Sequence, residues 1–341
     1  GTTFMGGFAT VQAAVAAASA GYTIQVAAGS YSEAVTVDKE VTIVGANAGI
    51  AYSGSRGTET VVTGGFHILA NGATLDGLQI NEGTSLGGET AGVFVQADGV
   101  TLTNCVFVRS EPVDSDGSRG LVTASGDATG LTVSNNSFTG WATGTYLNPG
   151  SDATVISGNA YSNNYVGLSV DDPDDVSINS NLFAYNTFEQ VGVGAIDATE
   201  DLSTQIAADN NFSGDAPQVS IYPLHGSAQS IVGTVHADVL NANTNAVTFT
   251  GGAGNDTING DAGSDTAAYL GDRADYTLGT TTNAAGLVTA INEVSDNNPG
   301  NGNEGSDSLF DIEALSFADG DLDLADPDRK STRLNSSHLV I

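Results

Sequence analysis

The stretch "LTVSNNSF" (Leu131–Phe138) is one copy of a phrase that returns several times in the first two thirds of the chain. Other copies are "VTLTNCVF" (Val100–Phe107), "ATVISGNAY" (Ala153–Tyr161) and "DVSINSNLF" (Asp175–Phe183). In this alignment an aliphatic residue that we expect to face inward precedes an aromatic residue by five positions. The aliphatic column contains Ile43, Leu75, Leu102, Val133, Ile156 and Ile178, and the aromatic column contains Phe107, Phe138, Tyr161, Phe183 and Phe212.

The spacing of these columns predicts a solenoid. Successive aromatics are 31, 23, 22 and 29 residues apart, so the shortest spacings give the coil length and the longer ones contain insertions. Repeats of roughly 20 to 50 residues with short strands bury their apolar faces against neighbouring coils. A second column beside the aromatics contains Asn136, Asn159, Asn181 and Asn210, whose stacked amides we expect to hydrogen-bond along the axis. Cys105 falls in that column, which predicts a small buried residue.

The alternative fold is a β-sandwich of many short strands. We prefer the solenoid because no hairpin signature interrupts the columns. Ahead of them, an alanine-rich stretch places Val11, Val15 and Ala18 on one helical face and is followed by Gly21, which can end a helix. Together these segments resemble the N-terminal cap and coils of right-handed parallel β-helices of the pectin-lyase-like superfamily. The resemblance implies an all-β fold with a small N-terminal capping helix over residues 1–215.

The sequence repeat changes after residue 232, from coils of about 22 residues to units of nine. In units of nine from Gly233 the chain reads "GTVHADVLN", "ANTNAVTFT", "GGAGNDTIN" and "GDAGSDTAA", with Leu240, Phe249, Ile258 and Ala267 at the inward strand position. The last two units fit the calcium-binding nonapeptide G-G-x-G-x-D-x-U-x. Glycine permits left-handed turns and aspartate supplies carboxylates, and Ca²⁺ takes six to eight oxygen ligands. The predicted calcium-site residues are Asp238, Gly252, Gly254, Asp256, Gly263 and Asp265.

Two nonapeptides make one turn, so residues eighteen apart stack on one edge. Asp238 and Asp256 therefore frame the better site, whereas Asp265 faces Val247 and leaves the other edge defective. This predicts one good calcium site and at most one partial site. A Gly/Asp-rich linker is the alternative interpretation.

The segment 233–327 resembles the repeats-in-toxin modules of proteins exported by type I secretion. The resemblance implies an extracellular protein with a calcium β-roll, which fits a chain that begins without a leader. We expect residues 216–232 to be a linker. Residues 328–341 resemble a translated sequencing adapter and are expected to be non-native.

Composition narrows the possible partners. The 341 residues contain 40 Asp and Glu against 8 Lys and Arg, a formal net charge of −32. Such a chain is not expected to bind nucleic acid, which needs Lys and Arg clusters. No apolar run is long enough to predict membrane insertion. The single cysteine excludes an intramolecular disulfide, and we expect a monomer.

One aspartate-rich segment contains the candidate catalytic residues. The candidates are Asp171, Asp172, Asp174 and Asp175 in "VDDPDD", which is similar to the Asp-Asp motif of polygalacturonases and supplies the two carboxyls that an inverting hydrolase needs. The alternative is a solvated turn around Pro173. The Asp-Pro-His signature of alginate epimerases is absent, and few cations are present to neutralise a uronate.

We therefore expect a secreted, calcium-binding β-helix protein that acts as a glycan-binding, surface or matrix component. The alternative is an extracellular polysaccharide-active enzyme, with a hydrolase ahead of a lyase or epimerase. An enzyme requires "DDPDD", the insertion 109–120 and the region 184–205 to converge. Trp141, Tyr146, Tyr161 and Tyr165 are candidates for stacking against sugar rings.

Overall fold

The computed structural model describes residues 6–110, 116–126, 128–171, 175–195, 206, 209–213, 219–223, 230–233, 237–242, 246–282 and 288–324. The chain divides into two compact units, residues 1–191 with 209–216 and residues 192–208 with 217–341. The predicted linker 216–232 is described only in part, and the predicted tail 328–341 lies outside the described residues.

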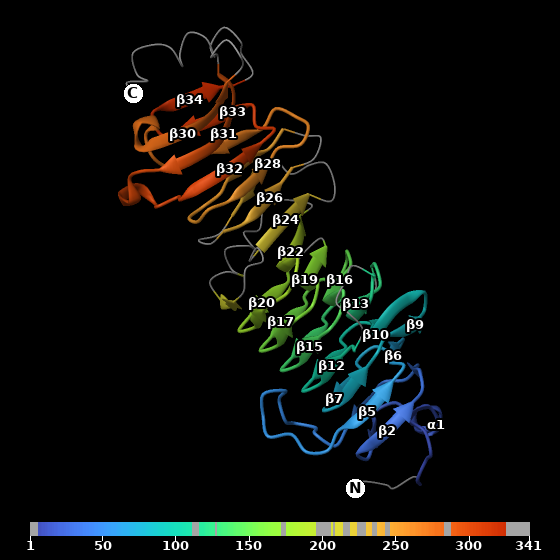
Figure 1. Cartoon of the computed structure of the whole chain (residues 1–341). Helices are drawn as coiled ribbons and strands as arrows, with labels where there is room; N and C mark the ends of the chain where they lie inside the picture. Colours follow the sequence, from blue (N-terminus) through green and yellow to red (C-terminus); the bar gives the residue numbers. More distant parts are fainter. Residues whose placement is uncertain are drawn as a thin grey trace. The chain divides into compact units, whose positions relative to one another are not determined.

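The first unit contains three sheets whose strands pair in parallel, apart from the antiparallel β9 (Thr84–Leu86) beside β10. The parallel strands alternate along the chain, so each coil contributes one strand to each sheet (Figure 1). The first sheet has the order β1 (Tyr22–Gln25), β4 (Val41–Val44), β7 (Thr74–Asp76), β11 (Thr101–Thr103), β14 (Thr132–Ser134), β17 (Val155–Ser157) and β20 (Ser177–Asn179). The second has the order β2 (Gly29–Ser32), β5 (Thr60–Thr63), β8 (Gln79–Asn81), β12 (Val106–Val108), β15 (Ser137–Thr139), β18 (Ala160–Ser162), β21 (Leu182–Ala184) and β23 (Asn211–Ser213). The third contains β3 (Val35–Val37), β6 (Phe66–Ile68), β10 (Glu89–Val95), β13 (Arg119–Thr123), β16 (Thr143–Leu147) and β19 (Val166–Asp171). This is a parallel β-helix, as predicted.

The predicted columns fill its core. Leu102 pairs with Leu75 and Val133 in the first sheet, and Phe138 pairs with Phe107 and Tyr161 in the second. Neighbouring strands lie about 4.8 Å apart, which suits face-to-face ring stacking. The centroid separations, from Phe107 through Phe138, Tyr161 and Phe183 to Phe212, are 4.4, 4.9, 5.0 and 5.2 Å.

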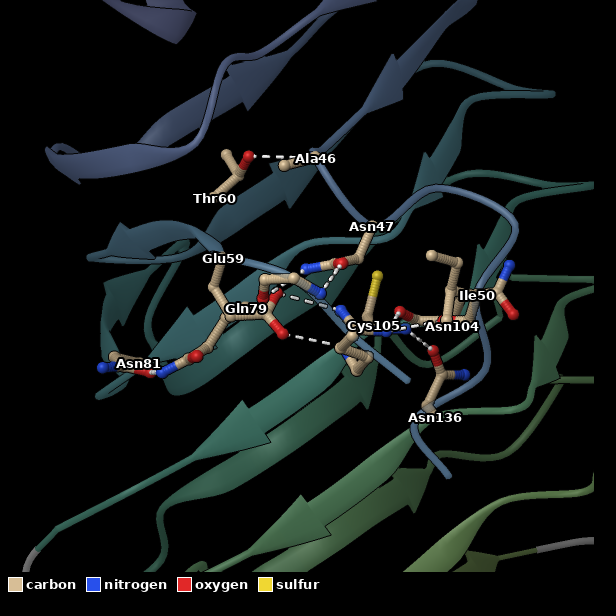
Figure 2. Close-up of polar contacts among 12 residues, drawn as sticks. Ala46, Asn47, Ile50, Glu59, Thr60, Gln79, Asn81, Asn104, Cys105 and Asn136 are labelled. Atoms are coloured by element: carbon tan, nitrogen blue, oxygen red, sulfur yellow. Dashed lines mark hydrogen bonds and ion pairs between the residues drawn. The ribbon is translucent and has the colours of Figure 1, made fainter. Parts of the chain in front are cut away.

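The asparagine column forms a hydrogen-bonded ladder. The Asn136 side-chain amide donates to Asn159 Oδ1 at 3.0 Å, and Asn159 donates in the same way to Asn181 at 3.0 Å. Asn181 continues the ladder to Asn210, and Asn136 Oδ1 accepts the backbone N–H of the buried Cys105 (Figure 2). Each amide thereby satisfies backbone groups that the turn leaves buried.

A short helix and left-handed turns complete the coils. Helix α1 (Val11–Ala17) buries Val11 and Val15 as predicted, but it ends at Ala17 rather than near Gly21 because Ala18 is already extended. From β7 onward, the first residue of the turn between the first and second sheets has a left-handed φ. Asn104, Asn135 and Ser180 adopt this conformation, as does Gly77, where a Cβ would overlap the backbone of Ala48.

The second unit is a β-roll of two facing strand sets. One sheet has the order β24 (Val219–Pro223), β26 (Val239–Asn241), β28 (Thr257–Asn259), β32 (Ser306–Phe310), β31 (Val288–Asp296) and β30 (Tyr276–Thr282). The other has the order β25 (Ser230–Val232), β27 (Thr248–Thr250), β29 (Thr266–Ala268), β33 (Ala314–Phe317) and β34 (Gly320–Asp323). The predicted nine-residue frame is confirmed, because Leu240 pairs with Ile258 and Phe249 pairs with Ala267.

Candidate functional site

The acidic residues predicted to bind calcium lie at the starts of neighbouring strands of the roll. Asp256 Oδ1 accepts the backbone N–H of Asp238 at 2.9 Å, and both side chains are buried. On the opposite edge Asp265 Oδ1 accepts the N–H of Val247 at 2.8 Å. Each carboxylate thus uses one oxygen to tie its turn to the turn eighteen residues earlier.

The second carboxylate oxygen of Asp256 and that of Asp265 do not take part in these hydrogen bonds. Asp256 Oδ2 and Asp265 Oδ2 are buried and have no hydrogen-bond partner among the described residues. Burial, together with the charges of Asp307 and Asp238, raises the pKa of Asp256 to about 9. Burial and the nearby Glu313 and Asp261 raise the pKa of Asp265 above its ordinary value. A buried carboxylate without a partner is costly, so these oxygens suit a cation.

The predicted glycines lie in the turns beside these oxygens. Gly252 and Gly254 have φ of 90° and 126°, which only glycine adopts readily. Gly263 is exposed in the equivalent turn before Asp265. A Cβ at the buried Gly251 would overlap Asp256 Oδ2, so glycine is required at this point of close approach.

This donor set fits calcium better than a transition metal. In the described ranges no three His, Cys, Asp or Glu side chains converge to hold a metal ion. The charged side chains beside Asp256 are those of Asp307 and Asp238, and those beside Asp265 are Glu313 and Asp261, so the side-chain donors are carboxylate oxygens. Ca²⁺ accepts such oxygen ligands.

Two further acidic residues join these ladders, and they were missed at the sequence level. Asp307 Oδ1 accepts the backbone N–H of Asp256 at 2.9 Å, and Glu313 Oε2 accepts that of Asp265 at 2.8 Å. The edge of Asp265, predicted to be defective, therefore has a second carboxylate. A signal for both was present: each stands two residues before an inward leucine, as Asp256 stands two residues before Ile258.

The candidate catalytic aspartates are only partly described. Asp171 ends β19, and Asp175 is exposed in the following turn with φ of 55°. Asp172 and Asp174 lie outside the described residues. The Asp171 carboxylate accepts a short hydrogen bond from the hydroxyl of Tyr146, which lies on the outer face of the third sheet.

Tyr146 also links Asp171 to the insertion 109–120. The Arg119 guanidinium lies 4.8 Å from the centre of the Tyr146 ring and forms an ion pair of 2.5 Å with Glu89. Burial and the hydrogen bond to Asp171 raise the pKa of Tyr146. Two of the three segments named for an enzyme, "DDPDD" and the insertion, therefore meet at one tyrosine.

The described basic residues all have partners. Lys39 donates to the last carbonyls of helix α1, and Arg109 pairs with Asp116 at 2.6 Å. Arg273 lies over the Phe317 ring. Arg56 anchors a loop by donating to Glu59 and to the carbonyls of Ile50 and Asn104, whose positions are shown in Figure 2. In the described part of the chain each Lys and Arg side chain is already engaged by a carboxylate, a carbonyl or an aromatic ring.

Exposed aromatic side chains occur at the turns between the second and third sheets. The Tyr165 and Phe188 rings stack at 5.2 Å, and Phe188 and Tyr185 are 49% and 68% exposed. Tyr185 has a left-handed φ of 56°, whereas the equivalent turn positions of the preceding coils are Gly140 and Asn163. Of the other predicted sugar-stacking residues, Trp141 and Tyr161 are fully buried, so that prediction is wrong for both; they belong to the core.

Both parts of the chain match known protein families. Residues 64–236, just over half of the chain, match the family described as right handed beta helix region. The chain belongs to this family. Within this β-helix protein, residues 232–267 match the RTX calcium-binding nonapeptide repeat (4 copies). No curated protein and no solved structure matches the β-helix protein.

These matches establish a right-handed β-helix with calcium-binding repeats C-terminal to it. The repeats imply that the β-helix protein binds Ca²⁺, and such repeats are typical of secreted proteins. Among the described residues no helix has the length and apolar character needed to cross a bilayer.

Proposed function

We propose that the β-helix protein is an extracellular, calcium-stabilised component of a surface or matrix that binds neutral glycan chains on its first unit. The observation that carries the proposal is the aromatic group of the half-buried Tyr165 and the exposed Tyr185 and Phe188. A bulky residue in left-handed backbone costs about 1–2 kcal/mol, and the 68% exposed Tyr185 ring is too open to recover this by packing. Strain of this kind concentrates at ligand sites, and an exposed aromatic face suits the apolar face of a sugar ring.

Glu89, Arg119, Tyr146 and Asp171 form a polar cluster on the third sheet. This cluster supplies hydrogen-bonding groups to the same unit. Tyr165 directly precedes β19 and Asp171 ends it, so the aromatic group and the cluster lie at opposite ends of one strand. Asp171 and Glu89 accept hydrogen bonds from hydroxyls, and Arg119 donates them. Arg119 covers one face of Tyr146, so this ring contributes its hydroxyl rather than a stacking surface.

Charge favours a neutral glycan over a polyuronate. The chain has a net charge of −32, and Arg119, the cation of this cluster, is already paired with Glu89. A polyanion would meet repulsion that no free guanidinium in the described first unit offsets. Hydroxyl-rich neutral chains avoid this cost.

The calcium-binding repeats support an extracellular location. Weak oxygen-ligand sites of extracellular modules have dissociation constants near millimolar. Such sites fill outside the cell and stay empty at cytoplasmic calcium levels, so the roll would gain stability on export. Type I secretion is the route that the repeats favour.

Retention on immobilised polysaccharides tests glycan binding. The full chain is run through gels containing neutral or acidic polysaccharides, with and without Ca²⁺, beside Tyr185→Asn and Phe188→Ala. We expect retardation by one or more neutral polysaccharides, which both variants lose, while the control Tyr22→Asn keeps it. Migration unaffected by every polysaccharide would contradict the proposal, as would full retention of Tyr185→Asn.

A polysaccharide hydrolase is the second candidate, and the Tyr146–Asp171 contact is the observation that favours it. An acid and a base on adjacent coils are the minimum that inverting hydrolysis requires. Release of reducing ends from a retained polysaccharide, abolished by Asp171→Asn but not by Asp175→Asn, would support this candidate. Retention without product release leaves the binding function.

A further inference from the structure

The calcium roll continues beyond its repeated sequence. Regular nonapeptides end with β29, and the chain then forms the antiparallel pair β30 and β31 before β32 and β33 return to the roll. The returning strands pair in parallel register, Leu309 beside Ile258 and Leu315 beside Ala267. Residues 305–317 therefore add another turn, although they lie past residue 267, where the matched repeats end.

This added turn reproduces the carboxylate ladder. Asp307 accepts the N–H of Asp256 at 2.9 Å, as Asp256 accepts that of Asp238 at 2.9 Å. Asp307 is 1% exposed, as is Asp256. Asp307 thus occupies the position of a repeat aspartate without belonging to a nonapeptide.

The two carboxylates face a common point. Asp256 Oδ2 and Asp307 Oδ2 both lie within 3.5 Å of the position that a Cβ on Gly251 would take. Asp256 Oδ2 has no hydrogen-bond partner, so two buried acidic groups approach each other with one oxygen unsatisfied. In a low-dielectric interior this repulsion is expensive unless a cation lies between them.

A backbone oxygen of the glycine turn lies against the returning segment. Gly305 packs directly on the carbonyl of Gly254, where any Cβ would overlap that oxygen. The N–H of Ser306 binds the side chain of Asn255 at 2.9 Å, which fixes the returning strand against the glycine turn. The Gly254 carbonyl is thus held against Gly305, two residues before Asp307, and Ca²⁺ takes backbone carbonyls as well as carboxylates as ligands.

We propose that Asp256 of the repeat "GGAGNDTIN" and Asp307, which lies beyond the nonapeptide repeats, form a calcium site between the glycine turn 251–254 and the returning strand β32. The proposal rests on the calcium-binding function of the roll. On the opposite edge Glu313 is less buried than Asp307, so the site is assigned to the Asp256–Asp307 edge. The antiparallel pair β30–β31 is then an insertion within the calcium module rather than its end.

Calcium stoichiometry of the full chain tests the site. Equilibrium dialysis with ⁴⁵Ca²⁺ compares the unmodified chain with Asp307→Asn and with Asp321→Asn, a matched charge change on exposed β34 whose carboxylate contacts Ser316. We expect Asp307→Asn to bind one ion fewer than the unmodified chain and Asp321→Asn to bind the same number. An unchanged number and affinity in Asp307→Asn would overturn the proposal.

A second measurement avoids dependence on a variant at the site. Tyr269 is buried beside Asp307, whose charge adds to burial in raising the pKa of the phenol. Tb³⁺, a luminescent substitute for Ca²⁺, is excited by energy transfer from a nearby tyrosine. We expect Tyr269→Phe to lose most of the sensitised emission while the exposed control Tyr185→Phe keeps it. Equal emission from both variants would place the ion elsewhere.

Failure of the proposed site can be distinguished from failure of the calcium-binding function. An unmodified chain that binds no Ca²⁺ contradicts the calcium function itself. A chain that binds Ca²⁺ but loses none on Asp307→Asn, with far-UV circular dichroism unchanged, contradicts only the site at Asp256 and Asp307.

Discussion

The carboxylate of Asp307 accepts a hydrogen bond from the backbone N–H of Asp256, although 51 residues separate them in sequence. The separation within the regular repeat is 18, as between Asp238 and Asp256. The extra residues contain β30 and β31, which leave the register of the roll unchanged on either side. The calcium-binding unit is therefore defined by strand register rather than by the sequence motif.

Calcium-free stability of the roll should fall as pH rises. The folded-state pKa values of Asp256 and Asp307 are about 9 and about 7, both above the value near 4 of an unfolded aspartate. Their stabilising contribution is therefore fully present below about pH 4 and is lost as pH rises through 7 and 9. Thermal unfolding in EGTA between pH 5 and pH 9 measures this loss.

Saturating calcium should reverse that trend, since the ion binds ionised carboxylates. The difference in Tm with and without Ca²⁺ is expected to widen steadily over the same pH range. A calcium shift independent of pH would contradict the assignment of buried carboxylates as ligands.

Asn159→Ala should destabilise the first unit by about 3 kcal/mol. Asn159 Oδ1 accepts both the N–H and the side-chain amide of Asn136, and its own amide donates to Val133. Its loss leaves these buried groups unpaired. Urea unfolding followed by fluorescence of Trp141, the single tryptophan, reports on this unit. Asn179→Ala, which loses only a contact with Ser177, is the control and should change stability by less than about 1 kcal/mol.

Cys105 should not react with thiol reagents in the folded chain. Its side chain is fully buried, and burial raises its pKa to about 12, so almost no thiolate exists near neutral pH. Labelling with a chromogenic disulfide should be absent in native buffer and complete in guanidinium. Native labelling at the rate of a free cysteine would contradict the buried position in the asparagine ladder.

Tyr185→Asn should leave the β-helix as stable as before or stabilise it by about 1 kcal/mol. Asparagine tolerates left-handed backbone better than tyrosine and already occupies the equivalent position at Asn163. Thermal unfolding compares this variant with Asn163→Tyr, in which strain is introduced and which should be destabilised. A marked loss of stability in Tyr185→Asn would show that the ring has a packing role.

The solenoid was predictable because its determinants recur at one spacing. Phe138, Tyr161 and Phe183 stand in phase with the asparagines beside them, so adjacent coils specify one register. A second ladder, in which Asn164 donates to Asn186 at 3.0 Å, was missed. It stands three residues after the aromatic column and has only two members, too few to form a visible repeat.

The remaining site features depend on register across insertions. Asp307 could not be aligned with Asp256 by counting in nines, because the inserted hairpin breaks the period; its position two residues before Leu309 was the one local signal. The meeting of Arg119, Tyr146 and Asp171 involves outward-facing positions that no core periodicity constrains. Such contacts follow only once the strands are paired in space.

The most direct test of the account is the calcium dependence of thermal unfolding in Asp256→Asn, since Asp256 adjoins both Asp238 and Asp307. At calcium concentrations 100-fold above the dissociation constant, binding adds about 2.7 kcal/mol, a rise in Tm on the order of 10 °C for a module of this size. We expect the unmodified chain and Asp321→Asn to show this rise and Asp256→Asn to lose most of it. A calcium shift in Asp256→Asn equal to that of the unmodified chain would contradict the account.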